Sequence, residues 1–504
     1  MHRITVIVLV LLVTISEVSG QVAINNTGAP PSASAMLDVQ STNKGFYPPR
    51  MSWSQIKAIQ SPGPGMVVFD LDFGKLRVYN GTKWAAIETD MPYDKPEGTS
   101  KVTPIFSELN LEKMEAVAVD PVSRNVYVTG ATTNNIYGEV VNGVSDGIVV
   151  AYNEAGERLW ARTFGSSSYD GGIALAVGND GSIYVGADIS GSLDGQAYSG
   201  GYDIAILKFN ASGDKQWSRS LGTSINDRVN KVQLDPSGNI YLIASTESAF
   251  PGFTNPTGLD LVLTKFDTNG SRLWLTQYGS ATAVFSNGFF VNSNGLFITG
   301  ISQGSIDGLP YAGGNADIFV LKYDFTGTKV FSILLGTDKY DYGQDIVVDA
   351  NGNFFVTGIT DGPLNGQTST LRSMGFIVKY DQWGTIQWTK LYTDDAFVNY
   401  PQYIRLDSQG NLFVIGGKIP ATHVDPFFDQ IKYIKKLDGN GNKIWTLDGG
   451  SDASNAIYGV STIYDGSFYI LGVFSGNYYY FGSNRIKNTG ATGTFESFLW
   501  RYAE

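Results

Sequence analysis

The side chains of this chain that could do chemistry are mostly carboxylates. Its 504 residues include 47 aspartates and glutamates, no cysteine and two histidines, His2 and His423. The absence of cysteine excludes disulfides, thiolate metal sites and cysteine nucleophiles, and a Ser-His-Asp triad has His423 as its one candidate base, because His2 falls in a leader segment. The chemistry left open is that of oxygen atoms: binding of a hard cation, glycoside hydrolysis by two carboxylates, or polar recognition of a ligand.

Three aspartates at equivalent positions are the candidate ligands for such a cation. Asp170, Asp227 and Asp341 each follow a repeated glycine by five residues. If they precede the innermost strands of a repeat fold, they form an acidic ring at a channel mouth that would hold Ca²⁺ through carboxylate oxygens. Val284 and Asn455 stand at further equivalents, so the ring is incomplete. Capping of a turn is the alternative role.

These positions belong to a repeat of 57 residues. Its turn glycines are Gly156, Gly213, Gly270, Gly327, Gly384 and Gly441. Four residues after each glycine comes an aromatic residue: Trp160, Trp217, Trp274, Phe331, Trp388 and Trp445. A second aromatic register steps by 56 to 58 residues through Tyr127, Tyr184, Tyr241, Phe297, Phe355, Phe413 and Tyr469. Two registers locked to one period indicate tandem copies of one structural unit, in which the recurrent tryptophan acts as a wedge between copies.

Each unit contains four strand-like runs separated by turn signals. In the second unit the runs are 173–177, 183–185, 204–209 and 216–221. Several third runs are apolar on successive residues, as required of a strand buried on both faces. Four-stranded antiparallel units at this spacing predict the blades of an all-β propeller.

Seven third strands begin at or near fixed positions, so we expect seven blades. These positions are Asp146, Asp203, Asp260, Asp317, Met374, Ile431 and Glu496. The last run has no fourth strand after it, whereas the strand-like piece 103–107 precedes the first unit without a partner. We therefore predict that this N-terminal strand completes the final blade and closes the ring, which hides two sheet edges.

The repeat resembles a known family at the level of its motifs. The stretch 203–222, which begins Asp-Ile-Ala-Ile-Leu-Lys-Phe, and the stretch Asp-Pro-Ser-Gly-Asn-Ile-Tyr-Leu at 235–242 resemble the SBBP repeats of bacterial seven-bladed propeller proteins. The resemblance covers about residues 103–504 and weakens in the fifth unit, where Met374 replaces Asp and Thr393 replaces Gly. It implies a secreted or surface-exposed propeller and brings no catalytic residues with it.

The residues before the repeat divide into three segments. Residues 1–20 contain an apolar run that is too short to span a bilayer, followed by Val18-Ser19-Gly20, and are expected to be a signal peptide. Residues 21–88 resemble an N-terminal module of exported Gram-negative surface proteins and of tail-fibre-like proteins, which suggests display or assembly. Residues 89–102 are expected to be a linker, and residues 103–504 the propeller.

The connections between second and third strands are long and differ in every unit, whereas the other turns within a unit are short. Variable loops on a repeated scaffold are typical places for binding. The candidate ligand-binding residues on these loops are Tyr198, Phe250, Phe253, Asp307, Tyr311, Phe427, Phe428, Tyr478, Tyr479 and Tyr480. Aromatic and acidic side chains together suit a sugar or a protein surface; the alternative is that each side chain fixes its own loop.

We therefore expect an exported, cell-surface or secreted protein without enzymatic activity, which binds or adheres to a glycan or a protein through the long-loop face. A secreted carbohydrate-active hydrolase using loop carboxylates is the alternative, and a purely structural surface protein is the second alternative. No cofactor is expected apart from Ca²⁺. The net charge of −12 argues against nucleic acid as a partner, and no transmembrane segment is expected after leader cleavage.

Overall fold

The computed structural model describes residues 22–24, 30, 37–39, 41, 46–71, 75–82, 84–86, 103–108, 113–254, 258–367, 373–394, 397–420, 431–451, 455–475, 478–481, 484–487 and 496–503. These residues fall into two compact units, divided after residue 89. The expected signal peptide, residues 1–20, lies outside the described residues, as does the whole expected linker, residues 89–102. Both segment assignments stay predictions.

The N-terminal unit is built from two small sheets. Strand β1 (Val22–Ile24) pairs in parallel with β2 (Leu37–Val39). The second sheet has the order β3-β4-β5-β6, and its elements are β3 (Arg50–Met51), helix α1 (Trp53–Lys57), β4 (Val67–Asp70), β5 (Lys75–Tyr79) and β6 (Trp84–Ala86). Asp70 is fully buried and accepts a hydrogen bond of 2.6 Å from Nε of Arg77, so its charge is paired.

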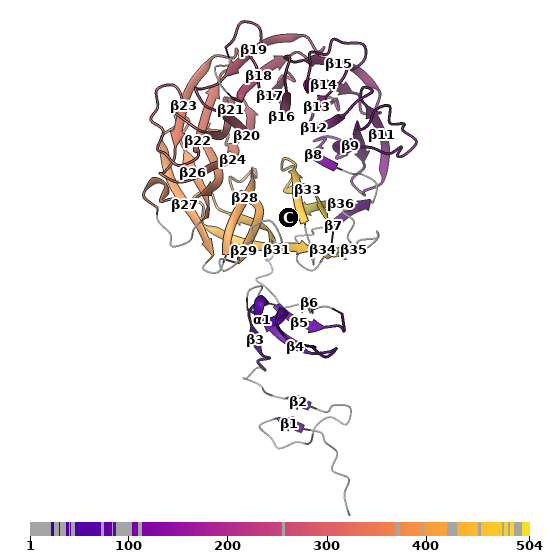
Figure 1. Cartoon of the computed structure of the whole chain (residues 1–504), viewed down its shortest axis with the longest axis vertical. Helices are drawn as coiled ribbons and strands as arrows, with labels where there is room; N and C mark the ends of the chain where they lie inside the picture. The colour runs from indigo at the N-terminus through magenta and orange to yellow at the C-terminus, as the bar shows by residue number, and fades with distance from the viewer. Residues whose placement is uncertain are drawn as a thin grey trace, which may run out of the picture. The chain divides into compact units, whose positions relative to one another are not determined.

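The larger unit consists of antiparallel sheets arranged around a centre (Figure 1). The first sheet contains β8 (Lys113–Val119), β9 (Val126–Thr132), β10 (Asp146–Tyr152) and β11 (Arg158–Phe164). The second contains β12 (Asp170–Val177), β13 (Ile183–Ile189), β14 (Asp203–Phe209) and β15 (Lys215–Leu221). The third contains β16 (Asp227–Leu234), β17 (Ile240–Thr246), β18 (Asp260–Phe266) and β19 (Arg272–Tyr278). The fourth contains β20 (Val284–Asn292), β21 (Gly295–Ser302), β22 (Asp317–Tyr323) and β23 (Lys329–Leu335).

The next two repeat units are joined edge to edge. The fifth unit contains β24 (Asp341–Val348), β25 (Phe354–Thr360), the 3₁₀ turn η1 (Leu364–Gly366), β26 (Met374–Tyr380) and β27 (Ile386–Asp394). The sixth contains β28 (Phe397–Leu406), β29 (Leu412–Pro420), β30 (Ile431–Leu437) and β31 (Lys443–Ser451). Two residue pairs connect β27 to β28, and a hairpin of β34 (Tyr478–Phe481) and β35 (Asn484–Lys487) adds to β31. The result is one continuous sheet of ten strands.

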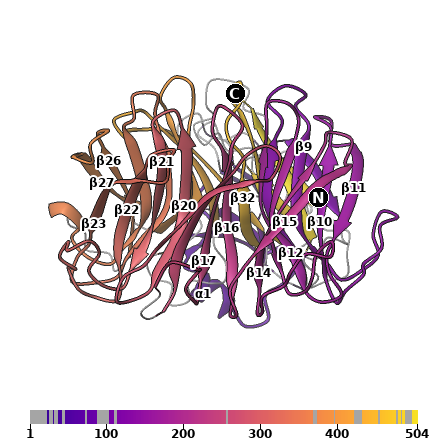
Figure 2. The same ribbon diagram turned by 90° about the horizontal axis from the view of Figure 1, so that it is seen from above.

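The strands lie where the repeat predicts them, and the all-β fold with four-stranded antiparallel blades is confirmed. The four runs expected in the second unit correspond to β12, β13, β14 and β15. The six turn glycines of the repeat have φ angles between 74° and 89°, a backbone region that residues with a Cβ rarely adopt. This requirement explains why glycine recurs with the period. Figure 2 shows neighbouring sheets standing side by side, with connections at both strand ends.

The recurrent tryptophans bridge neighbouring sheets, as expected of wedges. Nε1 of Trp160 donates to the carbonyl oxygen of Ala211 at 2.9 Å, and Nε1 of Trp217 donates to that of Thr268 at 3.3 Å. Each acceptor belongs to the last turn of the following sheet. A Cβ added to Gly213 in such a turn would lie 2.7 Å from the ring of Trp160. Glycine is therefore also needed for the close approach of the indole.

The final sheet takes one strand from the N-terminal side of the repeats. Its order is β32-β33-β36-β7, with β32 (Asn455–Val460), β33 (Ser467–Phe474), β36 (Glu496–Ala503) and β7 (Thr103–Glu108). β7 thus pairs with the last strand at the place that the sequence predicts. Side chains of the first and last sheets also share one core cluster, including Val126 with Leu471. A closed ring of seven blades stays a prediction consistent with these contacts.

Candidate functional site

The long loops carry the residues that the sequence singles out, and several of these residues fix their own loop. Oη of Tyr198 donates to the carbonyl oxygen of Gly201 at 2.6 Å, and Oη of Tyr311 donates to that of Gly314 at 3.1 Å. The two loops therefore repeat one device, in which a tyrosine closes a short glycine-containing bend. Tyr198 keeps 39% of its surface exposed, so its ring can still contact a partner.

Two of the ten candidates are buried, so their side chains are not accessible to a ligand in this structure. Phe250 is 4% exposed and packs in the core shared by the second and third sheets. Tyr479 is fully buried, with its ring centroid 4.1 Å from that of Phe498. Both side chains lie under their loops because the loops fold back onto the apolar sheet edges, a long-range contact that one sequence does not reveal.

The remaining aromatic candidates give less information. Phe253 is half-buried beside the same core as Phe250. The side chains of Tyr478 and Tyr480 lie outside the described part of the structure, as do Phe427 and Phe428. A binding role for these residues stays a prediction.

Asp307 is the acid among the long-loop candidates, and it belongs to an ion-pair network. Its carboxylate accepts hydrogen bonds from Nζ of Lys329 at 2.6 Å, from Oη of Tyr278 at 2.9 Å and from the hydroxyl of Ser332. Burial acts to raise the pKa of Asp307, but these three donors outweigh it and lower the pKa. Asp307 thus holds its loop against the outer strand β23.

The three candidate cation ligands are buried at the starts of β12, β16 and β24. Asp170 is 4% exposed, and Asp227 and Asp341 are fully buried. In each case one carboxylate oxygen accepts hydrogen bonds from the backbone N–H and the hydroxyl of the residue four positions earlier, such as Thr223 for Asp227. Burial raises the pKa of all three carboxyls. This geometry gives each aspartate a turn-capping role, and in the described part of the chain no three acidic or histidine side chains converge as a metal cage.

Cation binding at these aspartates stays a hypothesis that one variant tests. Capping predicts that Asp227→Ala lowers the free energy of unfolding by about 2 kcal/mol, because two buried donors lose their acceptor. The loss should be the same in Ca²⁺ and in EDTA when urea denaturation is measured. Calcium-dependent stabilisation of the wild type that Asp227→Ala abolishes would contradict pure capping and establish the cation site.

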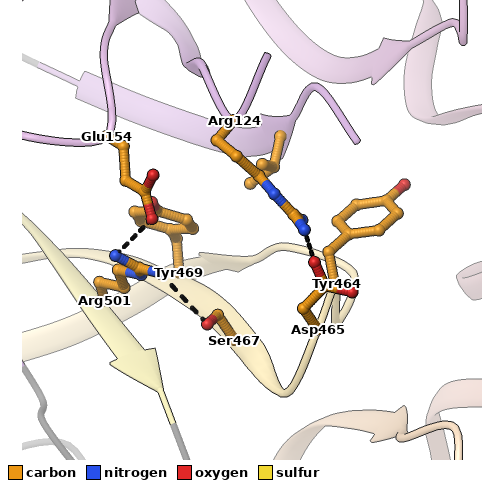
Figure 3. Close-up of a pocket in the computed structure, with 8 residues that line it drawn as sticks. Arg124, Glu154, Tyr464, Asp465, Ser467, Tyr469 and Arg501 are labelled. Atoms are coloured by element: carbon orange, nitrogen blue, oxygen red, sulfur yellow. Dashed lines mark hydrogen bonds and ion pairs between the residues drawn. The ribbon is translucent and has the colours of Figure 1, made fainter. Parts of the chain in front are cut away.

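A pocket of about 180 Å³ lies at the seam between the first and last sheets (Figure 3). We call it the seam pocket; its lining residues are Val119, Arg124, Glu154, Tyr464, Asp465, Ser467, Tyr469 and Arg501. They come from the short turns after β8, β10 and β32 and from the adjoining ends of β8, β33 and β36. The pocket therefore opens at the strand ends opposite the long loops.

Two ion pairs across the seam form the polar lining of this pocket. Nη1 of Arg501 lies 2.6 Å from Oε1 of Glu154, and Nη2 of Arg501 donates to Oγ of Ser467 at 3.4 Å. Arg124 pairs with Asp465 (Figure 3). Each arginine thus links one sheet to the other, and each pair remains partly open to solvent.

Tyr464, which is partly exposed, and Tyr469 form the aromatic wall of the seam pocket. Tyr469 is 3% exposed. Burial raises its pKa, Arg501 and Arg124 oppose the rise, and Glu154 adds to it. The neutral phenol is therefore the form present across the physiological pH range. The pocket combines an aromatic surface with two cations, two anions and hydroxyl groups, a set suited to a small, highly polar ligand.

The sequence analysis does not predict this pocket, although two signals point to it. The turns after β8 and β32 span residues 120–125 and 461–466, whereas the corresponding turns after β12, β16, β24 and β28 are one residue shorter. The final unit also lacks the recurrent tryptophan. Neither signal stands out in the sequence, because the turns between first and second strands and between third and fourth strands are short in every unit.

Comparisons with known proteins bear on both units. Residues 23–103 match the family described as the phage tail like trimerisation region. Among curated proteins, the regulatory protein FlaEY of Caulobacter vibrioides is 28% identical over 32% of this chain and 19% of its own length. An uncharacterized WD repeat-containing protein, L264 of Acanthamoeba polyphaga mimivirus, is 21% identical over 54% of this chain and 26% of its own length. The chain thus spans about a fifth to a quarter of these relatives.

Three solved structures are similar in fold over most of the chain. The β-propeller domain of the Trilobed protease from Pyrococcus furiosus has a TM-score of 0.43 at 10% identity and covers 76% of this chain and 99% of its own. The WD40 domain of Neurospora crassa Pan2 has a TM-score of 0.39 at 10% identity, covering 78% and 92%. An ulvan lyase of polysaccharide lyase family 25 has a TM-score of 0.43 at 9% identity, covering 78% and 95%.

No described helix is both long and apolar enough to cross a membrane. The chain thus combines a segment similar to the phage tail like trimerisation region with a β-propeller.

Proposed function

We propose that the protein is an exported, non-enzymatic binding or adhesion protein whose propeller recognises a glycan or a protein surface. The observation that carries the proposal is the seam pocket, a recess in a rigid scaffold with an aromatic wall and paired charges. Polar groups held in place by the scaffold cost little entropy when a ligand binds. The long-loop face, with Tyr198 and Phe253, remains the predicted contact surface for a larger partner.

Trimerisation would strengthen the binding of such a protein to a surface. The match of residues 23–103 to a trimerisation region supports a trimer, and three linked propellers would bind a repetitive surface with an avidity far above that of one site. Light scattering of the purified full chain should therefore give three times the protomer mass. A monomeric mass would remove the multivalent part of the proposal.

A secreted carbohydrate-active hydrolase is the second candidate, because Glu154 and Asp465 place two carboxylates in one pocket. Each is engaged by an arginine, which suits binding more than proton transfer. A glycan array followed by product analysis separates the functions: binding without turnover supports the proposal, and turnover supports the hydrolase. Binding of neither glycans nor proteins would leave a structural surface protein.

A further inference from the structure

We infer that the seam pocket is the slot of a missing tryptophan and that it takes a single pyranose ring of a glycan. This inference rests on the proposed binding function and names the ligand class for its pocket. It follows from comparing the seam with the other sheet junctions, position by position.

The strand register shows which residue stands where the other units have tryptophan. In the second and third sheets, Trp217 pairs with Lys208 and Trp274 pairs with Lys265. The same register recurs in the fourth, fifth and sixth units, as Lys322 with Phe331, Lys379 with Trp388 and Lys436 with Trp445. In the last sheet the partner of the equivalent residue, Arg501, is Thr103. The six other units all have an aromatic residue at this position, whereas the last sheet has Thr103.

A junction between sheets that contains the recurrent tryptophan shows which residues surround its ring. Trp217 lies with its centroid 6.1 Å from that of Tyr184, and its Nε1 donates to the carbonyl oxygen of Thr268. Nζ of Lys208 reaches the same carbonyl at 3.3 Å. Leu234, which ends the first strand of the following sheet, packs in the same cluster. The slot is thus bounded by a tyrosine, a basic side chain, a turn residue and an aliphatic side chain.

The same four positions line the seam pocket. Tyr469 occupies the place of Tyr184, since each pairs with the basic residue of its third strand. Arg501 stands for Lys208, Glu154 for Thr268 in the last turn, and Val119 for Leu234. The pocket therefore has the boundaries of an indole slot, but Thr103 stands where the other units have the aromatic ring.

The charges of the pocket decide which ring fits. An indole or phenyl group would desolvate Arg501, Glu154, Arg124 and Asp465 and offer them few hydrogen bonds, which is costly. A pyranose has similar ring dimensions, an apolar face for the partly exposed ring of Tyr464 and a rim of hydroxyl groups that both donate and accept. Cations and anions are balanced in number, which favours a neutral sugar.

The test is titration of the full chain with four free sugars, D-glucose, D-galactose, D-mannose and N-acetyl-D-glucosamine, observed by saturation-transfer NMR. We expect saturable binding of at least one of them by the wild type. Thr103→Trp should restore the ring of the repeat and weaken this binding at least tenfold. Glu154→Gln, which keeps the size of the side chain, should weaken it severalfold and serves if Thr103→Trp folds poorly.

Lys208→Arg is the matched control, because it introduces arginine at the equivalent position of a junction whose slot is filled. It should leave sugar binding unchanged. If Thr103→Trp and Glu154→Gln bind the sugar as the wild type does, the assignment of the sugar to the seam pocket is wrong, whereas the proposed binding function is unaffected. If no free sugar binds, the pyranose inference falls, and binding to a glycan array or to proteins still decides the proposed function separately.

Discussion

Deletion of residues 101–108 should abolish the single cooperative unfolding transition of the propeller and make the protein aggregate on heating. These residues contain β7, which is the fourth strand of the last sheet and pairs along β36. Without it, the backbone groups of β36 lose their partners and become an exposed sheet edge, which promotes intermolecular pairing. We expect the melting temperature to fall by at least about 3 °C, since the loss exceeds ~2 kcal/mol and the unfolding entropy of a chain of this length is large.

The matched control is deletion of residues 91–98, which has the same length and lies in the expected linker. That variant should melt like the wild type. Differential scanning calorimetry and light scattering measure both effects. An unchanged melt after removal of 101–108 would show that the last sheet is stable with three strands, and the prediction of ring closure would then be wrong.

The repeat explains how much of this fold the sequence predicts. A period of 57 residues constrains every copy at once, so a turn glycine such as Gly213 and a wedge such as Trp217 are recognised by recurrence and not by local propensity. Even the pairing of β7 with β36 follows by elimination, because one unpartnered strand precedes the repeats and one incomplete unit ends them. The ten-stranded sheet was not predicted: the contact between Thr393 and Val398 occurs where the fifth unit departs from the repeat.

Side chains on the loops were harder to place. The repeat does not constrain them, so neither the burial of Phe250 and Tyr479 nor the hydrogen bond of Tyr198 to its own loop could be derived. The seam pocket was missed for a related reason. It forms between the two repeat units that are farthest apart in the sequence. It also depends on the absence of an aromatic residue at Thr103, and a comparison that looks for residues shared by the units does not detect an absent one.

The second large effect that we expect is a pH dependence of the free energy of unfolding, and it comes from buried aspartates. Burial raises the pKa of Asp188 and of Asp317 from 3.8 to about 6, and for Asp317 the neighbouring Asp341 adds to the rise. Burial also raises the pKa of five further aspartates that, like Asp317, begin a strand: Asp170, Asp203, Asp227, Asp260 and Asp341. The folded chain therefore holds protons between pH 4 and 6 that the unfolded chain has released.

The propeller should consequently be most stable near pH 4 to 5 and lose stability as the pH rises through 6. A carboxyl whose pKa is higher in the folded state stabilises the fold below the unfolded value of 3.8, and this contribution is lost as the pH approaches the folded value. Each pKa unit corresponds to about 1.4 kcal/mol, so Asp188 and Asp317 together should reduce the free energy of unfolding by ~4 kcal/mol between pH 4 and pH 7. Below pH 4 the trend reverses, because Asp194 and Asp307 have lowered pKa values.

Urea denaturation in EDTA at half-unit steps from pH 4 to 8 measures this dependence without any contribution from bound cations. Asp317→Asn should flatten the curve and be more stable than the wild type at pH 7, since the amide keeps an acceptor for the N–H of Ala312 and removes a buried charge. Asp324→Asn is the matched control, because Asp324 lies in an exposed turn and its hydrogen bonds lower its pKa. That variant should keep the slope of the wild type between pH 4 and 7. A free energy of unfolding that rises with pH across this window would contradict the prediction, because it would mean that these buried aspartates are ionised in the folded chain and stabilised by their hydrogen-bond donors.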